Sequence, residues 1–249
     1  MKLVLIGSGN VAFHLANAFV ENNINLIQIF GRNEADLKQI STNTNIPFST
    51  KNLVEADIYI IAVNDGAVEE VSSLIKLKNC IVAHTSGSLP KEILKGKYNK
   101  AVFYPLQTFS KSKILDYQKI PFFLEAEDQS GFLALKDIAL QISDNVETST
   151  YEKRKFVHLS AVFACNFVNH LYARAKEIAD AHEIPFHYLY PLIEETTQKI
   201  QEINPKDAQT GPSVRNDVRI TKMQEELLEG EHLKIYQTMN ESIKEMYEL

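Results

Sequence analysis

Two hydrophobic patterns alternate along the first 150 residues. Short apolar runs predict strands over 1–6, 25–30, 57–63, 79–83, 100–104 and 120–124, and an edge strand over 145–148. Amphipathic stretches between them predict helices over 13–20, 34–40, 66–75 and 129–142. Strands that alternate with helices are typical of an α/β fold with a parallel, doubly wound sheet.

The pattern changes after residue 150. No later segment predicts a strand, and helices are predicted over 151–182, 186–203, 217–228 and 231–247. Pro185, Asn204-Pro205 and Gly230 mark the breaks between these helices. The sequence therefore predicts two domains, an α/β domain over 1–150 and an all-helical domain over 151–249.

A glycine-rich turn, Gly7-Ser8-Gly9-Asn10-Val11-Ala12, follows the first predicted strand and opens a helix. Gly7 allows a sharp turn, Gly9 has no Cβ to block a pyrophosphate, and Ala12 lets the helix lie close to the sheet. The helix start offers free N–H groups and its positive dipole end to phosphates. A tight turn in an unrelated α/β protein is the alternative. The strand before and the helix after favour a dinucleotide site that uses residues 7–11.

The second predicted strand ends in Gly31-Arg32-Asn33 rather than in an acidic residue. An acid there would accept hydrogen bonds from the ribose of NAD, whereas a guanidinium and an amide suit the 2′-phosphate of NADP. We therefore expect NADP, unless Arg32 is only a solvated residue before the next helix. Val63, the last residue of the third predicted strand, and Asn64 directly after it are expected to touch the cofactor. Asn64 or Asp65 also fits a helix cap.

The composition limits the partners and the cell compartment that can be expected. A net charge of −6 over 249 residues gives no general attraction to nucleic acid or anionic membranes. No apolar run approaches the roughly 20 residues that span a bilayer, and the first residues lack the form of a signal peptide. A cytoplasmic protein is expected. Cys80 and Cys165 are expected to be buried thiols, and neither a disulfide framework nor a zinc site is supported.

The stretch 156–171 is apolar on most of its circumference, as is typical of a buried helix. At about 100° per residue, His158, Asn166, Asn169 and His170 fall on one third of that circumference. Such a stripe indicates a substrate cleft against the nucleotide domain, with His158 and Asn166 as the best candidates. The alternative is a set of structural hydrogen bonds to neighbouring helices or to a partner subunit.

Four strings occur in order along the chain: HTSGS at 84–88, YPLQTF at 104–109, HLSAVFACNF at 158–167 and TGPSVRND at 210–217. With them the chain resembles the family that pairs a Rossmann-like domain with a DUF2520 domain. That family lies within the superfamily of 6-phosphogluconate dehydrogenase, pyrroline-5-carboxylate reductase and 3-hydroxyisobutyrate dehydrogenase. The resemblance implies an NADP-dependent oxidoreductase and covers nearly the whole chain.

The chain departs from its relatives at two places. Tyr104 stands where many of them carry a histidine, so a histidine is not a required acid there. The wider superfamily places a lysine and then an asparagine on the long helix. Asn166 could match that asparagine, but Val162 and Phe163 stand where the lysine is expected. The lysine-dependent mechanism therefore does not transfer.

Two functions remain open at this stage. The first is a reductase that moves hydride between NADPH and a small carbonyl or imine, which needs a bound cofactor, a proton donor and a substrate anchor. The second is a sensor or scaffold that binds NADP without turnover. The candidate catalytic residues are His158, His84, Ser86 and Asn166, and the candidate substrate-binding residues are Gln107, Asn169 and Arg215. Arg215 could instead pair with Asp217, which is placed to cap the next helix.

A homodimer through the helical domain is also expected. The 156–171 helix and the apolar and aromatic residues of 186–193 form more apolar surface than one nucleotide domain can cover. Soluble monomers rarely expose such a patch, and two-fold pairing is the commonest way to bury it. The alternative is that loops and the C-terminal helix cover it.

Overall fold

The computed structural model describes all 249 residues, which form two compact units, 1–166 and 167–249. The predicted domain boundary near residue 150 falls just after the last strand of the sheet. The compact units instead divide after Asn166, inside a long helical stretch, because the beginning of that stretch packs on the sheet.

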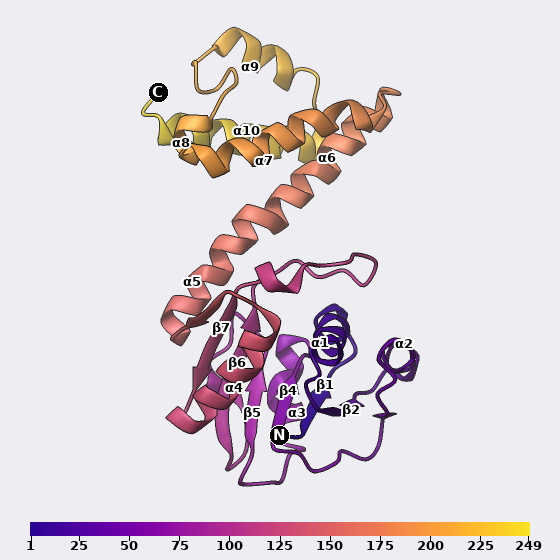
Figure 1. Cartoon of the computed structure of the whole chain (residues 1–249). Helices are drawn as coiled ribbons and strands as arrows, with labels where there is room; N and C mark the ends of the chain where they lie inside the picture. Colours follow the sequence, from indigo (N-terminus) through magenta and orange to yellow (C-terminus); the bar gives the residue numbers. More distant parts are fainter. The chain divides into compact units, whose positions relative to one another are not determined.

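The first unit is built on one eight-stranded sheet (Figure 1). Its strands are β1 (Leu3–Ile6), β2 (Leu26–Phe30), β3 (Phe48–Ser49), β4 (Ile58–Ile61), β5 (Ile81–His84), β6 (Asn99–Pro105), β7 (Phe122–Ala126) and β8 (Val146–Thr148). They lie in the order β3-β2-β1-β4-β5-β6-β7-β8. The order reverses between β1 and β4, where open α/β sheets bind their ligands.

The predicted α/β architecture is confirmed, but one part of the predicted parallel sheet is wrong. Strands β1 to β6 are parallel, whereas β7 runs antiparallel to β6, with Phe103 opposite Leu124. A parallel neighbour needs a crossover connection, usually a helix. Residues 106–121 contain only one 3₁₀ turn, so the chain re-enters the sheet at the edge it left.

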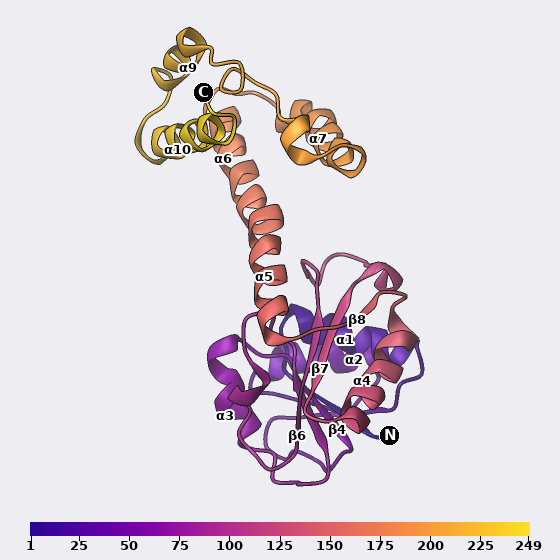
Figure 2. The ribbon, with the colours of Figure 1, turned by 90° about the vertical axis from the view of Figure 1, so that its left-hand side faces the viewer.

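Helices cover both faces of the sheet (Figure 2). Helices α1 (Asn10–Glu21), α2 (Glu34–Thr44) and α4 (Gln129–Ile142) pack on one face, and α3 (Val68–Ser72) packs on the other. Alternate residues of β1 explain this: Leu3 and Leu5 face the first set, while Val4 and Ile6 face the second. Both sides of the strand are buried, as a parallel sheet requires.

A long helical stretch follows the sheet and is continued by further helices. It consists of α5 (Tyr151–Ala161), a π-helical turn (Val162–Phe167) and α6 (Val168–Ala181). The second unit also contains α7 (Tyr190–Glu202), α8 (Pro205–Ala208), α9 (Val218–Glu225) and α10 (Gly230–Met246). The all-helical prediction for this region is therefore confirmed. None of the helices combines the length and the hydrophobicity that a membrane span requires.

The π-helical turn changes the predicted polar stripe. An i→i+5 turn holds more residues than an α-turn, so each residue rotates by less than 100°. The angular positions calculated for Asn166, Asn169 and His170 relative to His158 therefore do not apply. Sequence periodicity could not reveal this, because it assumes one helical pitch.

The same stretch is also less buried than its composition predicts. Phe156, Leu159 and Phe163 are each about half exposed or more in the single chain. Cys165 is exposed as well, so the prediction of two buried thiols is correct only for Cys80. An apolar pattern indicates that a helix face must be buried. It does not show whether the rest of the chain or a second copy of the protein buries that face.

Candidate active site

A cavity of about 410 Å³ opens in the first unit at the carboxyl ends of β1 and β4. The glycine-rich turn forms one side, the end of β2 forms a second, and the loops after β4 and β5 form the rest. Every predicted cofactor residue lines it: Gly7, Ser8, Gly9, Asn10, Val11, Arg32, Asn33, Val63 and Asn64. Thr85, directly after β5, also lines the cavity.

The glycine-rich turn has the form that a pyrophosphate needs. Gly7 has φ +139°, and a Cβ there would lie 2.0 Å from the carbonyl oxygen of Ala62, so only glycine fits. A Cβ on Gly9 would meet no atom within 4 Å, because it would point into open space. Helix α1 begins after Gly9 without a side-chain cap. Its first N–H groups are therefore available to an anion, and the turn fits a dinucleotide.

Arg32 and Asn33 differ in what they can offer. Both atoms of the Asn33 amide are used inside helix α2: Oδ1 accepts from the Asp36 N–H at 3.2 Å, and Nδ2 donates to Asp36 Oδ2 at 2.6 Å. Arg32 is exposed on the cavity wall and makes no ion pair. Arg32 is thus the side chain that can turn to a 2′-phosphate, and Asn33 positions the turn. Neither Asn64 nor Asp65 makes a side-chain capping bond, so the helix-cap alternative is not observed.

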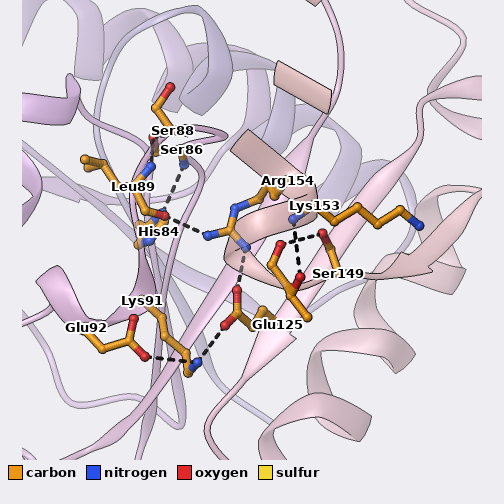
Figure 3. Close-up of polar contacts among 11 residues, drawn as sticks. His84, Ser86, Ser88, Leu89, Lys91, Glu92, Glu125, Ser149, Lys153 and Arg154 are labelled. Carbon is orange, nitrogen blue, oxygen red and sulfur yellow. Dashed lines mark hydrogen bonds and ion pairs between the residues drawn. The ribbon is translucent and has the colours of Figure 1, made fainter. Parts of the chain in front are cut away.

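The HTSGS loop is organised by two of the predicted catalytic residues. His84 is fully buried, and its Nδ1 accepts the N–H of Ser86 at 3.1 Å. The Ser86 hydroxyl oxygen in turn accepts the N–H groups of Ser88 and Leu89 (Figure 3). Burial lowers the pKa of His84 to about 4, and the nearby Arg154 charge adds to the effect. His84 is therefore neutral and out of reach of a substrate, which does not suit the predicted role of proton donor.

We expect His84 to make stability depend on pH. Its pKa is about 4 in the folded chain against 6.5 for an unperturbed histidine, so between these values the unfolded chain binds a proton that the folded chain does not. The contribution of His84 to the free energy of unfolding is therefore complete well above pH 6.5. It falls by about 3 kcal/mol as the pH drops to 4.

Urea titrations of the wild type and His84→Gln at several pH values measure this effect. The free energy of unfolding of the wild type should fall by about 3 kcal/mol more than that of His84→Gln over this pH range. His182→Gln replaces an exposed histidine and should behave like the wild type. Equal slopes for the wild type and His84→Gln would contradict the assignment.

A buried ionic cluster lies behind the same loop, and sequence reasoning missed it. The Arg154 side chain is completely buried; Nη1 donates to Glu125 Oε2 at 2.6 Å and Nη2 to the Leu89 carbonyl at 2.7 Å. Lys91 pairs with the other Glu125 oxygen at 2.6 Å (Figure 3). The cluster ties α5 to β7 and to the segment after β5. The only sequence signal for the cluster is Arg154 itself, a basic residue near the start of a helix, where the helix dipole disfavours a cation. That signal is weak.

One helical turn after Arg154, His158 meets Tyr104 of β6. The Tyr104 hydroxyl lies 2.9 Å from His158 Nδ1. Gly87 packs against both, since a Cβ there would lie 2.7 Å from the Tyr104 ring and 2.8 Å from His158. Thr85 lines the cavity, and two residues of chain span at most roughly 7 Å. Gly87 thus places the Tyr104–His158 pair two residues of chain away from the cavity wall, and neither side chain lines the cavity itself.

The remaining candidates are not brought together by this unit. Gln107 is exposed, and its Oε1 accepts the N–H of Thr108 at 2.7 Å. Asn166 is exposed in the π-helical turn, at the end of the first unit. Asn169 and Arg215 are exposed residues of the second unit. Asp217 caps α9 by accepting the Ile220 N–H, and Arg215 forms no ion pair with it.

Two family models match the chain. Residues 2–85 match the family described as NADP oxidoreductase, coenzyme F420-dependent. Residues 120–243 match a domain of unknown function, DUF2520. No curated protein matches the chain.

Solved structures are similar over the whole length. A "putative NADP oxidoreductase" from Bacteroides fragilis is 35% identical, with a TM-score of 0.93 over 98% of each chain. A Thermotoga maritima protein has 22% identity and a TM-score of 0.83 over 99% of this chain and 100% of that one. An imine reductase from Myxococcus stipitatus, in complex with NADP⁺, shares the fold at 12% identity and a TM-score of 0.68, over 98% and 93% of the two chains. The chain thus belongs to the oxidoreductase family that joins an N-terminal NADP oxidoreductase domain to a DUF2520 domain.

Proposed function

We propose that this protein is an NADPH-dependent reductase that transfers hydride to a small carbonyl or imine. The observation that carries the proposal is the Tyr104–His158 hydrogen bond of 2.9 Å, next to a cavity shaped for a dinucleotide. A reductase needs a held cofactor and a proton donor at the reacting end. The cavity meets the first need and His158 meets the second.

Each residue of the site has a separate task in this proposal. The N–H groups at the start of α1 bind the pyrophosphate, and Arg32 binds the 2′-phosphate. Burial raises the pKa of Tyr104 to about 12, so its hydroxyl stays protonated. In this proposal the hydroxyl donates to His158 Nδ1, which lies 2.9 Å away. Such a bond orients the imidazole ring and directs an Nε2–H toward the substrate.

The proposed reaction transfers one hydride and one proton to the substrate. When bound, NADPH supplies the hydride, which forms a new bond to the substrate carbon. His158 Nε2–H supplies the proton to the substrate nitrogen or oxygen, and solvent returns a proton to His158. Tyr104 keeps its own proton throughout and acts as a positioning residue.

Calorimetry with NADPH and NADH, followed by NADPH oxidation against keto acids, aldehydes and cyclic imines, tests the proposal. Cyclic imines are included because an imine reductase shares this fold. Gly9→Ala should weaken NADPH at least about 10-fold without lowering the melting temperature, because the new methyl would meet only the pyrophosphate. Gly66→Ala also points into open space, lies outside the cavity lining, and is the matched control.

The cofactor preference has its own variant. A charged bidentate contact contributes on the order of 10- to 150-fold in affinity, so Arg32→Ala should weaken NADPH by that factor and hardly change NADH. Equal wild-type affinity for both cofactors would contradict the preference for NADP. Cofactor binding without turnover on any substrate class would favour the sensor or scaffold role.

We also propose that the protein is a homodimer through its helical region. Half-exposed aromatic and aliphatic residues continue along the helical stretch from Phe156 to Phe167, and Tyr188, Tyr190 and Leu192 are more than half exposed. Soluble monomers rarely leave so many large apolar side chains of one region exposed. Light scattering at low micromolar concentration should give roughly twice the chain mass. A clean monomer peak at that concentration would contradict this proposal.

A further inference from the structure

The loop between β6 and β7, residues 106–121, is fastened to the cofactor side of the first unit (Figure 1). Asn10 of the glycine-rich turn donates through Nδ2 to the Phe109 carbonyl at 2.9 Å. His14, one turn further along α1, contacts the Ser110 carbonyl at 2.9 Å and the Tyr117 hydroxyl at 3.0 Å. These contacts hold the loop over the start of α1, where the dinucleotide is expected.

The same loop reaches helix α2 through one lysine. Lys111 Nζ lies 2.7 Å from Asp36 Oδ1 and 3.2 Å from Gln39 Oε1. Asp36 lines the cavity together with Arg32 and Asn33. The Asp36 carboxylate is therefore on the wall where a 2′-phosphate would bind, and without Lys111 it would present an uncompensated negative charge to that group.

We infer that Lys111 is a specificity-determining residue, which favours NADP(H) over NAD(H) by neutralising Asp36. The inference rests on the proposed function only for the identity of the cofactor. Asn33 Nδ2 satisfies the second Asp36 oxygen but carries no charge, so it cannot replace the lysine. The loop thereby contributes to cofactor choice from 75 residues away in sequence.

Binding constants for NADPH and NADH, measured by calorimetry on the full chain, test this inference. Lys111→Met should weaken NADPH on the order of 10-fold and leave NADH nearly unchanged, because one unpaired charge near a phosphate is worth that much. Asp36→Asn in the Lys111→Met background should restore NADPH binding. Lys113→Met is the control, since Lys113 is exposed on the same loop and its side chain forms no ion pair.

Four results would overturn the role proposed for Lys111. Equal weakening of NADPH and NADH by Lys111→Met would show that the lysine only holds the loop, and would overturn the inference while the proposed function stands. No change in NADPH, or the same change with Lys113→Met, would overturn it too. A wild type that binds neither cofactor would overturn both the inference and the proposed function. Melting temperatures of all variants separate these results from loss of folding.

Discussion

Replacing Arg154 by methionine is expected to lower the free energy of unfolding by about 3 to 5 kcal/mol. The substitution removes a fully buried cation and leaves Glu125 Oε2 and the Leu89 carbonyl without their donors. An unpaired buried charge costs far more than the pair itself contributes. Lys91 remains on the other Glu125 oxygen, so we expect the lower end of that range.

Two variants sharpen this result in urea unfolding at pH 7. Lys155→Met removes the neighbouring cation of the same helix, whose ion pair with Glu152 is solvent-exposed, and should cost a few tenths of a kcal/mol. Arg154→Met combined with Glu125→Leu should recover much of the loss, because both buried charges are then gone and Lys91 keeps its ion pair with Glu92 at 3.1 Å. A loss below about 1 kcal/mol for Arg154→Met alone would show that the cluster does not anchor α5.

Tyr104→Phe is expected to lower turnover by about 10²- to 10³-fold while the NADPH dissociation constant stays unchanged. The phenylalanine keeps the ring but removes the hydroxyl that is hydrogen-bonded to His158 Nδ1. The imidazole then loses its fixed orientation and tautomer, so fewer encounters present Nε2–H to the substrate. His158→Gln should cost at least as much, because the proton donor itself is lost.

Tyr98→Phe is the matched control for this experiment. Tyr98 is also buried in the first unit and donates to the Ser72 carbonyl at 3.1 Å, away from His158. Its loss should cost about 1 kcal/mol of stability and no turnover. If Tyr104→Phe reduces turnover no more than Tyr98→Phe does, the pair with His158 is structural and the proton comes from elsewhere.

The residues that line the cavity were predictable because they are close in sequence. Strand, glycine-rich turn and helix follow one another within about twenty residues, and each glycine has a local steric reason. The next two loops add Arg32, Val63 and Asn64 by the same rule, since the carboxyl ends of parallel strands meet at one edge of a sheet. Helix α4 was predicted to the residue for a similar reason, because its pattern and its Asp128 cap are local.

Only the tertiary structure decided the Tyr104–His158 pair and the long-range ion pairs of the first unit. The Tyr104–His158 contact joins residues 54 apart, Arg154–Glu125 joins residues 29 apart, and Lys111–Asp36 joins residues 75 apart. The antiparallel β7 and the π-helical turn were likewise invisible to periodicity. A hydrophobic pattern records which side of each element is buried, and a polar residue in it looks the same whether its partner is solvent or a distant side chain. Those partners are determined when the elements pack, and at that step the protein acquires its buried Arg154–Glu125 ion pair, its Tyr104–His158 pair and its Lys111–Asp36 ion pair.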